Sequence, residues 1–531
     1  MMDRIRIKVL EMKYMFALVM MNLLFVTSLN AQNNPIRKIK ADLKQIEGQK
    51  INVFNECVGA GRANEGLRAD WQQQLAMVQK EIGFRYIRFH GLLHDDMGVY
   101  REDKEGNVSY NWQYIDKLFD YLLSIKVRPF VELSFMPADL ASGTKTVFWW
   151  KSNVTKPKSY AKWDALIANL VTHWQERYGK DEVAKWYFEV WNEPDLKGFY
   201  DGTQDDYFEL YHHTAKAVKS VSHDYRVGGP ATSATKWIAD FLSYCASQKL
   251  PVDFVSTHDY GTNSVLDEFG TKKQKLKSNF DTIAQNVKRV RNLINASPYK
   301  EAELHFTEWN TSPSSRDPMH DTYQNATYVL NTLKKTGTAC NSMSYWTFTD
   351  IFEEAGPALT PFHGGFGLLN LQNIKKPTYY AYKFMNELGS TMLKNEDNSS
   401  YICTSNQKDV QALIWNYTFT DTGSNFNQGY FIKEQPSTIC QNAELEISNM
   451  QNGTYRVEIY KVGYHQNDPF TGYLEMGRPA QLTLKQEAEI KKLSTGLPAD
   501  VDNIVINNGS FKKRIPLRNN DIIFIKLIKK N

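Results

Sequence analysis

Short apolar runs alternate with amphipathic segments between residues 51 and 390. The runs are rich in β-branched and aromatic residues, as buried strands are. In the segments that follow them, apolar residues recur every three or four positions, which is the spacing of a helix packed on one face. The first such face consists of Leu67, Trp71, Leu75, Val78 and Ile82. This alternation predicts a parallel sheet with helices packed outside it.

Eight of the apolar runs are candidate strands, and eight strand and helix pairs favour a closed (β/α)₈ barrel. The last helix is expected to begin after Pro377 and to stop at Gly389, because natural helices favour proline at the start and glycine at the end. An open doubly wound sheet would normally carry a glycine-rich phosphate loop, and the sequence has none. The expected strands span residues 51–57, 85–90, 128–134, 186–193, 225–229, 253–260, 304–310 and 342–348.

The pattern changes after residue 395, where β-rich runs separated by Asn, Gly and Ser turns replace the long helical segments. Such a pattern is typical of a β-sandwich. The alternation in IRKIKADL would allow residues 32–50 to add a strand to that sandwich. The sequence therefore predicts a barrel over residues 51–392, followed by a β-sandwich domain over residues 393–531.

The first 31 residues have the features of a secretory signal peptide. Four basic residues between Arg4 and Lys13 precede the apolar run YMFALVMMNLLFVTSL, and Ala31 offers a small residue for cleavage. The run is shorter than the roughly 18 to 20 residues that span a bilayer, and Asn22 interrupts it, so a permanent membrane helix is the weaker interpretation. We expect an exported protein, periplasmic or secreted, with no membrane contact after cleavage.

Composition and the absence of certain motifs exclude several classes of function. The net charge is only +4 and no dense basic run is interleaved with aromatic residues, which argues against a nucleic-acid partner. The five cysteines are widely spaced, so buried free thiols are the default, with a bridge between Cys403 and Cys440 left open. The sequence lacks the HExxH motif that would suggest a metal site. It also lacks the G-x-S-x-G elbow that would suggest a serine hydrolase. The sequence implies no cofactor and carries no signal for an oligomeric state.

Two glutamates stand where reactive groups of a barrel are expected, at the carboxyl ends of strands. Glu193 follows Asn192 in FEVWNEPD at the end of the fourth strand, and Pro194 is expected to hold it in an extended conformation. Glu308 ends the seventh strand in TEWN. Hydrolysis of a glycosidic bond requires such a carboxyl pair across a cleft. A glutamate at a strand end is also a common salt-bridge partner or helix cap, so the pairing is a hypothesis.

Several segments taken together resemble glycoside hydrolase family 39, the family of β-xylosidases and α-L-iduronidases. The resemblance covers the whole barrel. It rests on FEVWNEPDLKGFY and HFTEWNTS around the two glutamates, and on CVGAGRANEGLRADW, GFRYIRFHGLLHDDMGVY, RPFVELSFMP, TVFWW, TDIFEE and PFHGGFGLL. WNEP alone is shared by many sugar-cleaving barrels, but the whole set in this order is specific.

The resemblance implies a retaining mechanism in which Glu193 is the general acid and then the base, and Glu308 is the nucleophile. The ionised Glu308 is then expected to raise the pKa of Glu193. Asn192 would bind the sugar 2-hydroxyl. A structural role is the alternative for the two histidines, and barrel packing is the alternative for the tryptophan. The other implied sugar-binding residues are His90, His258, Tyr260, Trp346 and either Glu353 or Glu354, with a slight preference for Glu353.

A neutral substrate is expected, because HDYGTN and TDIFEEAGPA carry no basic residue to bind an acidic sugar. This favours an exo-acting β-xylosidase that releases a neutral pentose from plant-type oligosaccharides by double displacement. The alternatives are another sugar, namely an α-L-iduronide, an arabinoside, a β-glucoside or a β-galactoside, or a catalytically silent carbohydrate-binding protein. Asp259 departs from the family pattern and could alter specificity or pH optimum, and the lysine-rich residues 271–277 could contact an extended or acidic branch.

Overall fold

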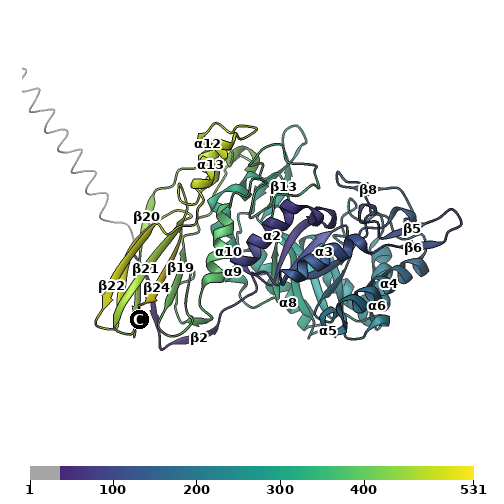
Figure 1. Ribbon diagram of the computed structural model, residues 1–531, viewed down its shortest axis with the longest axis horizontal. Coiled ribbons are helices and arrows are strands. Elements are labelled where there is room, and N and C mark those ends of the chain that lie inside the picture. The colour runs from purple at the N-terminus through teal and green to yellow at the C-terminus, as the bar shows by residue number, and fades with distance from the viewer. Residues whose placement is uncertain (1–35, 531) are drawn as a thin grey trace, which may run out of the picture.

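The computed structural model describes residues 36–530 (Figure 1). The predicted signal peptide, residues 1–31, and the first residues of the segment that follows it lie outside this range. Among the described residues, no helix combines the length and the apolar character needed to cross a membrane.

Eight parallel strands close into a barrel in the order β3, β4, β7, β10, β11, β12, β15 and β16, which confirms the predicted fold. The strands are β3 (Cys57–Arg62), β4 (Tyr86–His90), β7 (Arg128–Leu133), β10 (Tyr187–Val190), β11 (Arg226–Thr232), β12 (Phe254–Tyr260), β15 (Glu303–Asn310) and β16 (Ser342–Tyr345). The helices around them are α2 (Ala69–Ile82), α3 (Gln113–Ser124), α4 (Tyr160–Tyr178), α5 (Lys180–Val183), α6 (Gln204–Val221), α7 (Ile238–Ser247), α8 (Thr282–Asn295), α9 (Tyr323–Thr336) and α10 (Pro377–Glu387).

The first barrel strand differs from its prediction. Residues 51–56 form a turn, and the strand begins only at Cys57. The turn is apolar because Phe54 belongs to the barrel core, where its ring lies 6.2 Å from that of Tyr382, rather than because it pairs as a strand. Gly59 lies within the true strand, where a Cβ would stand 2.2 Å from the ring of Trp346. The glycine is therefore needed for the close approach of that tryptophan.

Two antiparallel-rich sheets form the second domain, as predicted for a β-sandwich, and their strands gather at the left of Figure 1. The larger sheet contains β2 (Ile46–Gln49), β17 (Thr391–Leu393), β18 (Ser400–Thr404), β19 (Val410–Trp415), β24 (Ile522–Lys529), β21 (Gly453–Val462) and β22 (Asp500–Ile506). The smaller contains β1 (Ile36–Asp42), β20 (Ile439–Ser448) and β23 (Phe511–Arg518). The chain thus enters through one strand in each sheet, β1 pairing with β20 and β2 with β17. Three short helices, α11 (Asn427–Tyr430), α12 (Pro469–Glu475) and α13 (Leu484–Lys492), complete this part.

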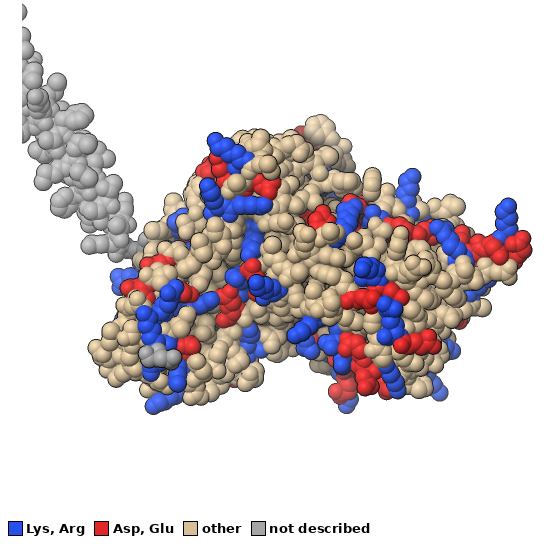
Figure 2. All heavy atoms as spheres, viewed as in Figure 1, with Lys and Arg blue, Asp and Glu red and all other residues tan. Residues whose placement is uncertain are grey.

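Three small hairpins lie within the barrel loops. They are β5 (Tyr100–Glu102) with β6 (Val108–Tyr110), β8 (Thr146–Val147) with β9 (Ser152–Asn153), and β13 (Thr262–Leu266) with β14 (Lys272–Leu276). Strand β14 contains most of the lysine-rich segment noted in the sequence. Acidic and basic side chains are interspersed over the face of the molecule in Figure 2.

The bridge left open between Cys403 and Cys440 is not formed. All five cysteines are free, and these two lie on β18 and β20, in different sheets. Cys440 is partly exposed, and the other four thiols are buried, as expected.

Side chains of the barrel strands fill the interior in layers. The lowest layer is mainly aromatic: the buried His305 packs against three rings of an apolar cluster made up of Cys57, Tyr86, Phe130, Tyr187 and Phe254. Two residues further along β4, β7 and β10, the inward positions hold Arg88, Glu132 and Glu189, all buried. The charged layer lies directly beneath the strand ends that carry the predicted site.

Candidate active site

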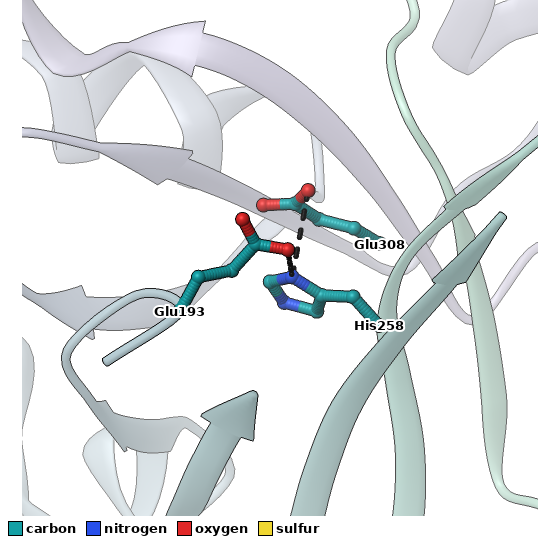
Figure 3. A group of neighbouring side chains, drawn as sticks. All are labelled: Glu193, His258 and Glu308. Carbon is teal, nitrogen blue, oxygen red and sulfur yellow. Dashed lines mark hydrogen bonds and ion pairs between the residues drawn. The ribbon is translucent and has the colours of Figure 1, made fainter. Parts of the chain in front are cut away.

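Glu193 and Glu308 converge on one histidine (Figure 3). Nδ1 of His258 lies 3.0 Å from Oε1 of Glu193 and 3.5 Å from Oε2 of Glu308. One carboxylate oxygen of Glu193, one of Glu308 and one ring nitrogen of His258 all lie within 4.8 Å of one another. Retaining glycosidases hold their carboxyl groups about 5 to 5.5 Å apart, whereas inverting enzymes need about 6.5 to 9.5 Å to admit a water. The spacing here is that of a retaining pair.

The turn that carries Glu193 differs from the expected extended backbone. Strand β10 ends at Val190, and Trp191 and Glu193 both adopt left-handed conformations, with φ of 71° and 43°. The prediction that Pro194 holds Glu193 extended is therefore wrong. The backbone is fixed instead by hydrogen bonds: the Glu193 amide donates to the Ala231 carbonyl at 2.9 Å, and the Glu193 carbonyl accepts from the amide of Leu196 at 3.0 Å.

Arg88 organises the floor of the site. Its buried guanidinium lies 2.5 Å from a Glu189 oxygen, 2.8 Å from Glu132 and 2.9 Å from Oε1 of Glu308. It also donates to Oδ1 of Asn192 at 2.9 Å, which leaves the Asn192 amide nitrogen able to donate elsewhere. Sequence reasoning did not select Arg88. The available signal was strand alternation: Arg88 lies two residues before His90 on β4, so both side chains point to the same side, into the barrel.

His90 is a second buried cation beside the pair. Its Nδ1 lies 2.7 Å from Glu132, and its Nε2 lies 3.3 Å from Glu354 and 3.7 Å from Glu308. Burial lowers the pKa of His90, but the carboxylates of Glu132, Glu354 and Glu308 together outweigh it and raise that pKa to about 10. The imidazole is therefore charged at neutral pH and holds negative charge on Glu308.

The hydrogen-bond network assigns the proton on His258. Thr307 donates to Glu189 at 2.8 Å, so its oxygen accepts from Nε2 of His258 at 3.1 Å. Burial lowers the pKa of His258, and a neutral ring protonated on Nε2 offers Nδ1 as an acceptor. Glu193, 3.0 Å away, can satisfy that acceptor only when its carboxyl group is protonated.

The two glutamates have different electrostatic surroundings. Burial, followed by the negative charge of Asp195, raises the pKa of Glu193 to about 8. Burial also raises the pKa of Glu308, but the positive charges of Arg88 and His90 oppose this, and the hydroxyl of Tyr260 donates to Oε2 at 2.8 Å. Glu193 therefore keeps its proton while Glu308 carries the charge. Burial and Asp195 are the main causes of the raised Glu193 pKa, and the contribution predicted for Glu308 is not among the largest ones.

The site opens into a cavity of about 320 Å³. Trp346 forms part of its floor, and His258, which does not line the cavity, contacts both glutamates. The cavity brings together seven of the nine predicted residues with seven others. Its lining consists of His90, Asn192, Glu193, Tyr260, Glu308, Trp346 and Glu354, together with Leu196, Phe199, Lys272, Gln274, Pro313, Ser314 and Phe366.

The slight preference for Glu353 over Glu354 is wrong. The carboxylate of Glu353 is held by Arg62 at 3.0 Å and Arg68 at 2.6 Å, and Glu353 does not line the cavity. Glu354 does line it, beside His90. Asp259 also points elsewhere, because it accepts from Asn286 at 2.7 Å, so it does not supply the extra acid considered for the sugar site.

The donor atoms of Glu193, His258 and Glu308 are close enough to surround a metal ion. Their surroundings do not fit one. Arg88 and the cationic His90 already supply positive charge to the carboxylates, and a bound cation would engage both carboxyl groups that hydrolysis requires.

Comparisons with known proteins extend the likeness beyond the barrel. The family model described as Glycosyl hydrolases family 39 matches residues 37–501. A β-xylosidase of Caldicellulosiruptor saccharolyticus is 40% identical over 468 residues, covering 86% of this chain and 92% of the relative. A β-xylosidase of Geobacillus stearothermophilus is 46% identical over 369 residues, covering 68% and 73%. The crystal structure of the GH39 enzyme from Xanthomonas axonopodis pv. citri matches with a TM-score of 0.91 at 37% identity, covering 94% of this chain and 99% of that one.

Proposed function

This chain belongs to glycosyl hydrolase family 39, and from that premise we propose that it is an exo-acting retaining β-xylosidase that releases a neutral pentose. One observation carries the proposal. A carboxyl group with a pKa of about 8 lies within 4.8 Å of a carboxylate held by an arginine and a tyrosine, at the base of a cavity. The names of the two xylosidase relatives support the choice of sugar.

In the first step, Glu308 attacks the anomeric carbon while Glu193 donates its proton to the leaving oxygen. Arg88 and Tyr260 each hold one oxygen of Glu308, which fixes the direction of attack. The bond to the leaving group breaks as the ester to Glu308 forms. The leaving group departs as a neutral alcohol.

In the second step, esterified Glu308 no longer carries charge, so one source of repulsion against an ionised Glu193 is gone. Glu193 then takes a proton from water, and that water attacks the anomeric carbon from the face that the leaving group vacated. Cleavage of the ester returns Glu308 to the carboxylate form and gives a product of retained configuration.

The sugar is held by groups that suit a neutral ring. The free amide nitrogen of Asn192 can donate to the 2-hydroxyl, because Arg88 already binds its oxygen. Trp346 offers an aromatic face to the apolar side of the ring. Glu354 can accept from hydroxyl groups, and its negative charge disfavours an acidic sugar at this position.

A panel of aryl glycosides tests this proposal, with the β-xyloside compared against arabinoside, β-glucoside, β-galactoside and α-L-iduronide. We expect the highest kcat/KM on the β-xyloside and a β-configured first product by NMR. Glu308→Gly should lower kcat by about 10⁴-fold or more, with azide restoring turnover and yielding the α-azide. Glu193→Ala should cost about 10²- to 10⁴-fold on substrates with poor leaving groups.

Faster cleavage of another sugar would redirect the substrate assignment within the family, whereas an α-configured first product would end the retaining mechanism. Absence of turnover on every member of the panel, with sugar binding intact, would favour the silent carbohydrate-binding alternative.

A further inference from the structure

The hairpin β13–β14 extends the lining of the cavity beyond the barrel strands. Alternate residues of a strand point to opposite faces, and on β14 the residues that face the cavity are Lys272 and Gln274. Lys273 and Lys275 occupy the other face. Lys273 lies 3.7 Å from Asp267, and Lys275 donates to the carbonyl of Gly423 at 2.6 Å.

The hairpin is held in place from several sides. The Gln274 side chain is buried and hydrogen-bonded to Thr262 at 2.8 Å, and its backbone amide donates to Gln428 of the second domain at 3.1 Å. At the base, Lys277 donates to the carbonyl of Tyr260 at 2.7 Å and lies 3.5 Å from Asp259. The backbone that presents Lys272 is therefore fixed beside the site.

Lys272 differs from the other lysines of this segment. Within residues 36–530 it forms no ion pair, while its three neighbours on the hairpin each contact an acid or a carbonyl. It is also the one Lys or Arg in the described lining of a cavity that holds three glutamates. A hydrated point charge on a flexible stem is suited to an anionic group that arrives from solvent.

The depth of Lys272 in the cavity indicates which part of a substrate it would contact. Trp346, His90 and Asn192 are buried and form the floor, whereas Lys272 is exposed and lies at the mouth. A sugar whose anomeric carbon lies between the two glutamates occupies the floor. The leaving group extends outward, so Lys272 faces the aglycone and not the released pentose.

We infer that Lys272 is a specificity-determining residue that favours aglycones bearing a carboxylate, such as a chain end substituted with a uronic acid. The inference rests on the proposed function for the neutral sugar at the floor. It adds a charge preference on the leaving-group side.

A matched pair of aryl β-xylosides tests the inference, one with a 4-carboxyl group and one with the isosteric 4-carboxamide on the ring. We compare the ratio of their kcat/KM values in the wild type, Lys272→Met and Lys273→Met. The ratio should fall about two- to fivefold in Lys272→Met, the size expected for an exposed charge pair. It should stay unchanged in Lys273→Met, which removes the same charge from the opposite face. The wild-type preference should weaken at 1 M salt.

An unchanged ratio in Lys272→Met, or an equal fall in Lys273→Met, would overturn the inference, as would an equal loss on both substrates. If neither β-xyloside is cleaved, the proposed function fails separately. The same carboxyl and carboxamide pair is then placed on the glycoside that the chain does cleave, and the ratio still decides the role of Lys272.

Discussion

The lower and upper halves of the barrel interior come from the same strands and yet contain opposite kinds of side chain. Tyr86 and Phe130 belong to a mainly aromatic layer, while Arg88 and Glu132, two residues further along the same strands, belong to a charged one. Strand alternation keeps all of these side chains inside. The comparison indicates that the lower half stabilises the closed barrel and that the upper half sets the protonation of the reacting groups.

Each charge of this layer lies against at least one opposite charge. Arg88 contacts Glu132, Glu189 and Glu308, and Glu132 is shared with the cationic His90. Burial raises the pKa of Glu132, but His90 and Arg88 outweigh it and lower that pKa below its usual value. A buried charge without such partners would cost several kcal/mol. The layer therefore depends on every member being present.

Among the variants considered, removal of Arg88 should have the largest effect on both stability and kcat. Arg88→Met leaves buried carboxylates without their shared cation, so the free energy of unfolding should fall by about 3 to 5 kcal/mol. Loss of a donor to Glu308 should lower kcat by about 10²- to 10³-fold. The pKa of Glu308 should rise, which moves the acid limb of the pH profile upward. Denaturant unfolding and pH-dependent kinetics measure these effects.

Arg88→Lys is the matched control, because it keeps the charge but loses the planar fork that reaches several partners. It should recover most of the stability and only part of kcat. A variant Arg88→Met with near-normal kcat would show that the charged layer does not govern Glu308.

A substitution in the lower layer should reduce stability but leave activity nearly unchanged. The ring of Phe130 is stacked on Tyr187 at 4.7 Å and meets Phe254 edge-on at 5.4 Å. Phe130→Ala should cost about 3 to 5 kcal/mol of stability through the cavity it leaves. kcat/KM, measured well below the midpoint of thermal unfolding, should stay within about twofold of the wild type. A loss of activity as large as that of Arg88→Met would remove the distinction between the layers.

The neighbouring residues Glu353 and Glu354 should show the same division, one supporting stability and the other activity. Glu354→Gln removes a charged acceptor facing the sugar, so kcat/KM should fall by about 10- to 100-fold. Glu353→Gln weakens the contacts with Arg62 and Arg68 and should mainly lower stability, by about 1 to 3 kcal/mol. Steady-state kinetics beside thermal unfolding separates the two. Equal kinetic effects would contradict the placement of Glu353 outside the sugar site.

The barrel could be predicted because most of its strands are continuous apolar runs. Strand β3 could not, since CVGAGR contains two glycines, which strands disfavour, and the reason for Gly59 is a tryptophan almost 290 residues away. The adjacent apolar turn at residues 51–56 took its place in the prediction.

The candidate site could be predicted where position along a strand was enough, as for Glu193 and Glu308. The choice between Glu353 and Glu354 required knowing that Arg62, at the end of β3, and Arg68, just before α2, contact Glu353 from a distant part of the sequence. The role of the lysine-rich segment likewise depended on how the hairpin folds over the mouth. Strand alternation places Arg88 inside the barrel, but its partners Glu132, Glu189 and Glu308 come from three other strands, and the sequence does not show that they meet.

The smallest predicted effect concerns Asp195, which raises the pKa of Glu193 without facing the substrate. A protonated Glu193 is required for the first step, so kcat/KM should decline as pH rises through about 8. Asp195→Asn removes a negative charge that disfavours ionisation of Glu193, so the pKa should fall and the basic limb should move to lower pH. Asp195 also accepts from the Ser233 amide at 2.7 Å, which the asparagine oxygen can preserve. A pH profile of kcat/KM on the aryl β-xyloside measures the shift, with Asp195→Glu as the control that retains the charge. A basic limb that stays in place would assign the raised pKa to burial alone.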